Sequence, residues 1–152
     1  MNTAPANIHG TAITVDGIGL LYLGPSGGGK SGLAFDCLAE ARLRQLPGAL
    51  VADDRVLILQ DEDRIIASCP DAIRGLIELR YSGIVSVDHV AEAEIHFAVL
   101  PVPSNEGDRL PPDNEKANLA PGIRLPAIRV PLWSRFPLSL IFARIQTLKG
   151  NG

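Results

Sequence analysis

The chain has 152 residues, of which 46% are hydrophobic and 20% are charged, and its formal net charge is −3. A chain of this length buries enough surface to fold without a disulfide or metal ion, so we expect residues 1–152 to form a single domain. The negative charge argues against binding along a nucleic-acid backbone, which requires clustered Lys and Arg. The apolar runs are too short to span a bilayer, which argues against a membrane protein.

The N-terminus and the two cysteines favour a cytoplasmic location. Residues 1–7 lack the basic start and the apolar stretch of a secretory signal, and we expect them to be flexible. Cys37 and Cys69 lack the spacing of metal ligands. In a reducing compartment both would remain thiols, and packing in the core is the expected role of each.

The first predicted elements are a β-hairpin and a helix. Asp16-Gly17 is a turn signal between two apolar runs, which predicts a hairpin over residues 13–23. The second strand is nearly all apolar, so we expect it to be central and buried. From Ser31 to about Arg44, apolar residues recur at three- and four-residue spacing, which predicts an amphipathic helix.

Two acidic residues follow the next predicted strand. Residues 49–52 are apolar and predict a short strand with Asp53 and Asp54 at its carboxyl end. The chain then continues in extended form over residues 56–59, and residues 65–69 are expected to pair back as a hairpin.

The second half of the chain contains a polar interruption. Alternating apolar residues predict a strand around residues 95–99. Residues 101–126 are rich in Pro, Asn, Asp and Glu, which predicts a surface loop. Residues 137–148 carry apolar side chains in helical register and predict a final amphipathic helix. Together these elements predict an α/β fold with a mixed, partly antiparallel sheet.

The segment between the hairpin and the first helix has the Gly-x-x-x-x-Gly-Lys-Ser pattern of a phosphate-binding loop. Glycines let backbone N–H groups close around phosphate oxygens, and the helix adds its positive N-terminal dipole. We expect Lys30 to be a solvent-facing residue that reaches the terminal phosphates, and Ser31 to ligate Mg²⁺. The predicted nucleotide-binding residues are Gly24, Pro25, Ser26, Gly27, Gly28, Gly29, Lys30 and Ser31.

Asp53 and Asp54 are the candidate acidic residues beside this loop. One carboxylate can hold the metal ion, and its neighbour can accept the proton of an attacking hydroxyl. An Asp-Asp pair in a surface turn is the alternative interpretation. Because successive strand side chains point to opposite faces, we expect the two residues to divide the work.

Four separated blocks resemble the catalytic domain of the HPr kinase/phosphorylase family, in the short form without an N-terminal domain. Residues 8–10 (Ile-His-Gly) are similar to the start of that domain, and the phosphate-binding loop follows. Residues 51–56 (Val-Ala-Asp-Asp-Arg-Val) resemble the family's Asp-Asp block. Residues 78–84 (Glu-Leu-Arg-Tyr-Ser-Gly-Ile) resemble its Glu-x-Arg-Gly-x-Gly-Ile signature.

The resemblance implies an ATP- and Mg²⁺-dependent kinase that phosphorylates a serine of HPr, the phosphocarrier protein of the bacterial sugar phosphotransferase system. Some members also reverse the reaction by phosphorolysis. It further implies a core similar to the nucleotide-binding part of phosphoenolpyruvate carboxykinase, and a homo-oligomer, often a hexamer.

The resemblance also implies roles for single residues. Asp54 would be the general base and Asp53 would support it and bind metal. Ser31 and Glu78 would be metal ligands. His9 would help to order the phosphate site.

Arg80 would lie near the transferring phosphate, and two nearby positions depart from the family pattern. Gly32 stands where many members have an acidic residue. Tyr81 replaces a glycine in the block associated with the reverse reaction, and we therefore expect phosphorolysis to be weak. The ring of Tyr81 would remove the space or the backbone angle that glycine provides.

Two other functions fit the same motifs. One is a P-loop kinase of a small hydroxylated metabolite, for which a closed pocket would be expected. The other is a regulator that senses ATP without transferring phosphate. Trp133 and Arg135 suit either a recognition surface or the edge of the core, and their role stays open.

Overall fold

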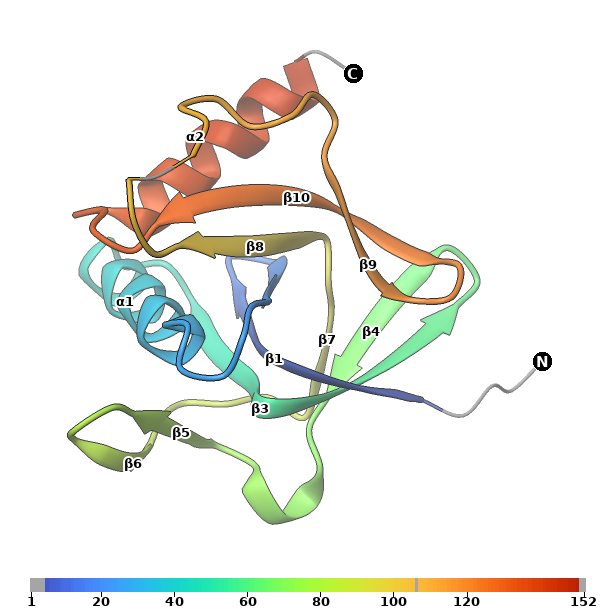
Figure 1. Ribbon diagram of the computed structural model, residues 1–152. Helices are drawn as coiled ribbons and strands as arrows, with labels where there is room; N and C mark the ends of the chain where they lie inside the picture. Colours follow the sequence, from blue (N-terminus) through green and yellow to red (C-terminus); the bar gives the residue numbers. More distant parts are fainter. Residues whose placement is uncertain (1–4, 106, 151–152) are drawn as a thin grey trace.

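The computed structural model describes residues 5–105 and 107–150, and an eight-stranded sheet forms most of this structure (Figure 1). Its strands are, in spatial order, β7 (Glu92–Glu94), β4 (Arg64–Ser68), β3 (Gly48–Asp61), β1 (Ala6–Val15), β2 (Ile18–Tyr22), β8 (Phe97–Val102), β10 (Ile123–Pro131) and β9 (Lys116–Ala120). β8 is parallel to both β2 and β10, while the other neighbouring strands are antiparallel. The predicted α/β class with a mixed sheet is confirmed.

The predicted first hairpin is present as β1 and β2. Asp16 and Gly17 form its turn with φ angles of 51° and 81°, the left-handed pair that a tight two-residue hairpin turn requires. β2 lies between β1 and β8, and its side chains are almost completely buried. The prediction of a central second strand is therefore confirmed.

Two helices cover one face of the sheet. α1 (Lys30–Leu43) and α2 (Pro137–Gly150) contact each other, and both predicted helices are confirmed. The core on this face combines Leu33, Ala34, Leu138 and Ile141 with the strand residues Ile13, Leu20, Leu50, Val99 and Ile128. Neither helix, as far as residues 5–105 and 107–150 show, is long and apolar enough to cross a membrane.

A carboxylate of α1 fixes the start of α2. Glu40 is buried, and its two carboxylate oxygens accept hydrogen bonds from the backbone amides of Leu138 and Ser139 at 2.8 and 2.9 Å. These amides belong to the first turn of α2, where no intrahelical partner is available. The helix that begins at the glycine-rich loop is therefore joined to the C-terminal helix by a buried polar contact.

A second core fills the other face of the sheet. Apolar residues of β4, β9 and β10 belong to one cluster with those of β1 and β3, which shows that the long hairpins at the two ends of the sheet curl toward each other. The members of this cluster include Ala12, Val51, Val56, Ile65, Ala117 and Leu125. Cys69 is in this second core and Cys37 is in the first, and both are free thiols, as predicted.

Three predicted boundaries were wrong. Asp53 and Asp54 lie inside β3, because that strand continues from Gly48 to Asp61. The expected loop over residues 101–126 contains β9 and the start of β10. The expected flexible segment 1–7 overlaps β1, which begins at Ala6, whereas residues 1–4 lie outside the described residues.

A small separate hairpin lies against the large sheet. It is formed by β5 (Leu76–Leu79) and β6 (Gly83–Ser86), after a short 3-10 helix, η1 (Asp71–Ile73). Ile77 of β5 is fully buried in the first core, which holds the hairpin beside α1 and β3. The hairpin thus carries the predicted signature block to the edge of the glycine-rich loop.

Candidate active site

The glycine-rich loop connects the buried strand β2 to α1, in the order that the sequence predicts. Gly27 and Gly29 have φ angles of 78° and 91°, which residues with a Cβ rarely adopt. Gly29 is the N-cap of α1. The N-terminal end of this helix, with its partial positive charge, therefore points at the loop.

Lys30 is the first residue of α1, and its predicted solvent exposure was wrong. Its relative exposure is 6%, and Nζ donates to the carbonyl oxygens of Gly24 and Pro25, both at 3.0 Å. Burial lowers the pKa of Lys30, while the negative charges of Asp54 and Asp53 act in the opposite direction. The ammonium group is therefore held within the loop and faces two carboxylates.

Asp53 is a buried carboxylate that accepts hydrogen bonds from three elements. Oδ1 accepts from Thr11 Oγ1 at 2.8 Å and from Ser31 Oγ at 2.6 Å. Oδ2 accepts from the backbone amide of Glu78 at 2.9 Å. The carboxylate thus connects β1, the start of α1 and β5, and its orientation is fixed on both oxygens.

Asp54 is exposed and pairs with His9. Its Oδ1 lies 2.8 Å from Nε2 of His9, and the two side chains are 67% and 45% exposed. Successive strand residues normally face opposite sides, but Asp54 has a φ of 71°. This left-handed backbone turns Asp54 into the same cavity as Asp53, so the expected separation onto opposite faces does not occur.

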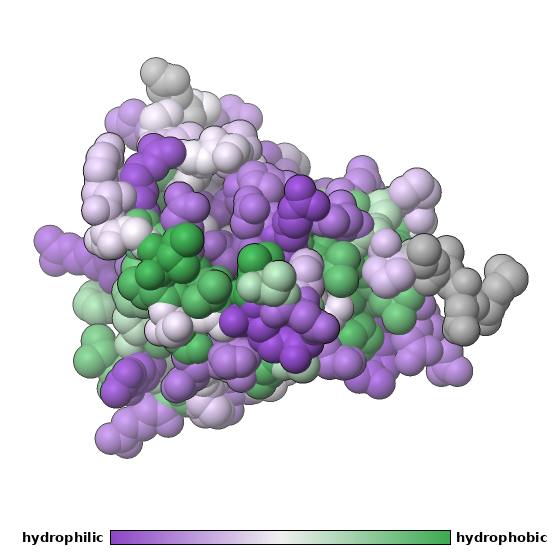
Figure 2. Space-filling model, turned by 90° about the horizontal axis from the view of Figure 1, so that it is seen from below, coloured by the Kyte–Doolittle hydropathy of each residue, from purple (hydrophilic) through white to green (hydrophobic). Residues whose placement is uncertain are grey.

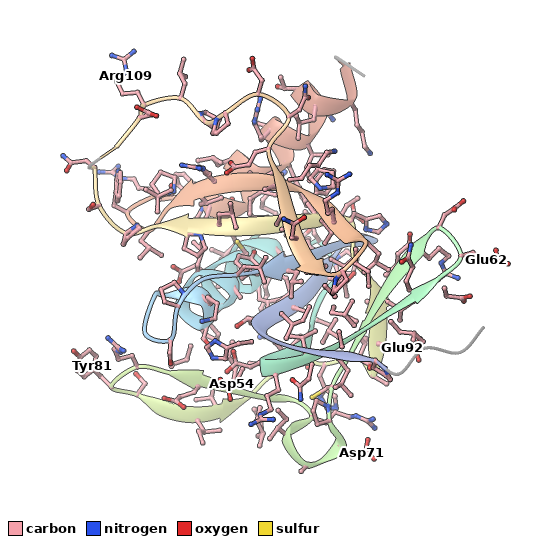
Figure 3. The ribbon with its side chains drawn as sticks, turned by 45° about the vertical axis from the view of Figure 1, so that its right-hand side comes forward. Asp54, Glu62, Asp71, Tyr81, Glu92 and Arg109 are labelled. Carbon is pink, nitrogen blue, oxygen red and sulfur yellow. The ribbon has the colours of Figure 1, made fainter. Side chains whose placement is uncertain are left out.

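The β5–β6 hairpin brings the signature block to the site. The exposed Glu78 and Arg80 line the same cavity as the glycine-rich loop. Arg80 lies so close that a Cβ on Gly27 would be 2.7 Å from a guanidinium nitrogen. Figure 3 shows Asp54 near this hairpin and Tyr81 at the hairpin's far end.

Tyr81 does not occupy the cavity. Its side chain is completely exposed. Its backbone has a left-handed φ of 71°, although the sequence analysis expected only glycine to provide such a backbone angle. The predicted steric obstacle at this position was therefore wrong. Figure 2 shows apolar side chains exposed beside polar ones on one face of the molecule. Leu76 and Ile84 of the hairpin are themselves 36% and 68% exposed.

These groups converge on a cavity of about 280 Å³. It is lined by His9, Ser26, Gly27, Gly29, Lys30, Ser31, Gly32, Asp53, Asp54, Glu78, Arg80 and Leu132. Every catalytic and metal-ligand candidate named from the sequence is in this set, whereas Gly24, Pro25 and Gly28 of the loop do not line the cavity. Thr11 and Leu132 were missed.

The two missed residues differ in the signal that the sequence offers. Thr11 follows His9 by two positions, so both side chains face the same side of a strand, and this spacing could have identified it. Leu132 packs on the loop, where a Cβ on Gly29 would lie 2.9 Å from its side chain. It is more than a hundred positions from the loop in sequence, and no local pattern marks it.

A larger cavity, of about 710 Å³, lies between the segment around residues 102–116, β10 and α2. None of the predicted site residues lines it. We assign the chemistry to the smaller cavity because the glycine-rich loop, the lysine and the paired carboxylates meet there. Size alone supplies no reacting group.

The oxygen atoms around Ser31 fit a small divalent cation. Ser31 Oγ and the Asp53 carboxylate are hard ligands of the type that Mg²⁺ prefers, and Glu78 lines the same cavity. Within residues 5–105 and 107–150, no three His, Cys, Asp or Glu side chains form a metal cluster by themselves. Mg²⁺ usually binds through one or two carboxylates together with substrate phosphates and water, so this donor set is sufficient.

A mixed sheet in which a glycine-rich loop leads into a helix opposite two aspartates defines a P-loop α/β protein. Comparison with known proteins identifies the group within this class. The family model of the HPr serine kinase C-terminal domain matches residues 2–143. The chain belongs to this family, and the predicted resemblance is confirmed.

Individual relatives agree with this assignment. An HPr kinase/phosphorylase of Geobacillus thermodenitrificans is 34% identical over 139 residues, which cover 82% of this chain and 42% of that protein. One of Bacillus cytotoxicus is 42% identical over 81 residues, or 53% of this chain and 24% of that protein. The chain thus matches less than half the length of these relatives.

A solved structure matches nearly the whole fold. The Hpr(Ser) kinase/phosphatase from Coxiella burnetii superimposes with a TM-score of 0.74 and 26% identity, covering 97% of this chain and 99% of that one. The arrangement of β-strands and helices described above is therefore that of a known HPr(Ser) kinase/phosphatase.

Proposed function

We propose that this protein is an ATP-dependent serine kinase that phosphorylates HPr. The observation that carries the proposal is one cavity in which the glycine-rich loop and Lys30 face the His9–Asp54 pair, in a chain of the HPr serine kinase family. Phosphate-binding and proton-accepting groups are both needed for phosphoryl transfer to a hydroxyl.

The phosphate groups of ATP would lie on the glycine-rich loop. The loop amides, the N-terminus of α1 and the Lys30 ammonium would hold the negative charge. Ser31, Asp53 and Glu78 would hold Mg²⁺, which neutralises charge on the phosphates when bound. The Lys30 side chain would exchange its carbonyl partners for phosphate oxygens.

Asp54 would accept the proton of the attacking serine. Its exposure leaves room for a hydroxyl carried by another protein, and the contact with His9 holds the carboxylate in one orientation. Arg80, which lies over Gly27, would stabilise the transferring phosphoryl group.

The exposed Asp54 favours a protein substrate over a small metabolite. A metabolite kinase would be expected to enclose the hydroxyl that it phosphorylates, whereas the proposed base is 67% exposed. HPr is the partner that the family membership supports. We further propose a single catalytic domain, a cytoplasmic location and a homo-oligomer, for which a hexamer is the expectation from the family resemblance.

The expected weakness of the reverse reaction loses its steric reason, because Tyr81 points away from the cavity. It stays a prediction about rates. Supplying serine-phosphorylated HPr with inorganic phosphate and following pyrophosphate release measures it directly.

Labelled ATP, Mg²⁺ and purified HPr from the same organism test the proposal. Transfer of label to a serine of HPr supports it. ATP binding with no transfer to HPr would favour a nucleotide-sensing regulator, and transfer only to a small hydroxylated compound would favour a metabolite kinase.

A further inference from the structure

Thr11 is a buried polar residue that the proposed roles do not use. It lies in β1 directly opposite Asp53 of β3, and its side chain is completely buried. Its hydroxyl donates to Oδ1 of Asp53 at 2.8 Å. A hydroxyl at a buried position in a sheet costs free energy unless it is hydrogen-bonded, and Asp53 supplies the acceptor.

The carboxylate of Asp53 has little freedom left. Each carboxylate oxygen offers about two acceptor positions. On Oδ1 these positions are taken by Thr11 and Ser31, and on Oδ2 one is taken by the Glu78 amide. Thr11 and the Glu78 amide bind the carboxylate from different strands, and together they fix the plane of the group.

A fixed carboxylate determines where the Ser31 hydroxyl points. A hydroxyl has one proton and two lone pairs, and the Ser31 proton is directed at Asp53 Oδ1 over 2.6 Å. Its lone pairs then point away from Asp53, and Ser31 lines the cavity beside Lys30.

We infer that Thr11 is a positioning residue, which holds Asp53 Oδ1 so that Ser31 presents its lone pairs to a divalent cation in the cavity. The inference rests on the proposed Mg²⁺-nucleotide site. It assigns Oδ1 of Asp53 to orienting Ser31, and leaves Oδ2 as the oxygen with an acceptor position for the cation or its water. Thr11 itself touches neither the cation nor the nucleotide.

The test is to replace Thr11 by valine, which has the same branched shape without the hydroxyl. Thr11→Ser restores the hydroxyl, Thr11→Ala removes it without adding volume, and Thr14→Val makes the same change elsewhere in β1. The readout is calorimetric binding of a non-hydrolysable ATP analogue across a Mg²⁺ titration, with thermal unfolding measured in parallel.

We expect Thr11→Val and Thr11→Ala to weaken Mg²⁺ affinity about 10- to 100-fold, the range for removing an outer partner of a metal ligand. Metal-free binding of the analogue should stay unchanged. Thr11→Ser and Thr14→Val should behave like the wild type. A fall in melting temperature with unchanged Mg²⁺ dependence would show a merely structural role and overturn the inference.

A double-mutant cycle tests whether the effect passes through Ser31. In a Ser31→Ala background, Thr11→Val should cause no further loss of Mg²⁺ affinity, because the hydroxyl that it orients is absent. An equal loss of Mg²⁺ affinity in the wild-type and Ser31→Ala backgrounds would overturn this inference but not the proposed function. Wild-type protein without Mg²⁺-dependent nucleotide binding would overturn the proposed function as well.

Discussion

Lys30 meets two opposing demands at the scale of a single residue. The proposed phosphate binding needs its charge, yet the side chain is buried and burial lowers its pKa. The loop carbonyl oxygens of Gly24 and Pro25 partly compensate for the lost water. Replacing Lys30 therefore affects two separate quantities. The unfolding free energy reports the cost of burying the charge, and the turnover rate reports the proposed role of the charge in phosphoryl transfer.

We predict that Lys30→Met abolishes phosphotransfer with the fold intact. Methionine keeps an unbranched apolar chain in the buried space, and removing one preorganised electrostatic group costs about a hundredfold or more in rate. The measurement is turnover with ATP together with circular dichroism. Near-normal turnover would show that Lys30 does not bind the phosphates.

The lowered pKa of Lys30 also predicts that the stability difference between the wild type and Lys30→Met depends on pH. Because the folded pKa lies below the unfolded value of 10.5, the buried charge costs stability at neutral pH. That cost fades as pH rises from the folded pKa through the unfolded one. The unfolding free energy of the wild type, measured relative to Lys30→Met, should therefore increase toward high pH.

The two aspartates are predicted to respond differently to replacement by asparagine. Asp54→Asn should stop the chemistry while nucleotide binding and stability persist, because Asp54 is exposed. Asp53→Asn should weaken the metal–nucleotide complex and lower the unfolding free energy by about 1–3 kcal/mol, since an amide cannot accept all three hydrogen bonds. Kinetics, calorimetry and denaturant unfolding of both variants provide the comparison. Equal effects on binding, rate and stability would contradict this division.

At the scale of elements, Glu40 joins the two helices. Glu40→Gln leaves one carbonyl oxygen for the amides of Leu138 and Ser139 and removes the negative charge at the start of α2. We expect the unfolding free energy to fall by about 1–2 kcal/mol. Glu92→Gln, at an exposed position of β7, is the matched control. Equal stability of the two variants would show that the cap contributes nothing.

The β5–β6 hairpin carries a second testable feature at this scale. Tyr81 has a left-handed backbone and a fully exposed ring, so Tyr81→Gly removes strain without removing packing. We predict that the unfolding free energy rises by up to about 1 kcal/mol. Chemical denaturation measures this change. A loss of stability would mean that the exposed ring contributes more than the backbone strain costs.

Sequence reasoning located the elements that have local signals. The Asp16-Gly17 turn, the glycine-rich loop and the three- and four-residue spacing of α1 act over a few positions, and each appears where predicted. β10 was not predicted, because Pro126 interrupts the pattern of apolar residues that would indicate a strand. Residues 123–126 pair with β9 and residues 127–131 pair with β8, so this proline lies where the strand changes partner.

The candidate site was predictable in composition but less so in geometry. The catalytic and metal-ligand candidates that the motifs named all line the cavity, whereas the burial of Lys30 depends on contacts that no motif encodes. The backbone at Asp54 is left-handed inside a strand, against the preference of most residues. The usual alternation of strand side chains therefore predicted, wrongly, that Asp54 would face away from Asp53. Leu132 reaches the loop only through tertiary packing.

At the scale of the whole molecule, a fold of the HPr serine kinase family forms one cavity that combines a glycine-rich loop and a lysine with two aspartates. We propose that this cavity phosphorylates a serine of HPr with Asp54 as the base. The decisive experiment is mass spectrometry of HPr incubated with Mg²⁺ and ATP, using wild-type and Asp54→Asn protein at matched nucleotide occupancy. We expect phosphoserine with the wild type and a loss of at least about a hundredfold with Asp54→Asn. HPr left unmodified by the wild type, or modified equally by both proteins, would contradict it.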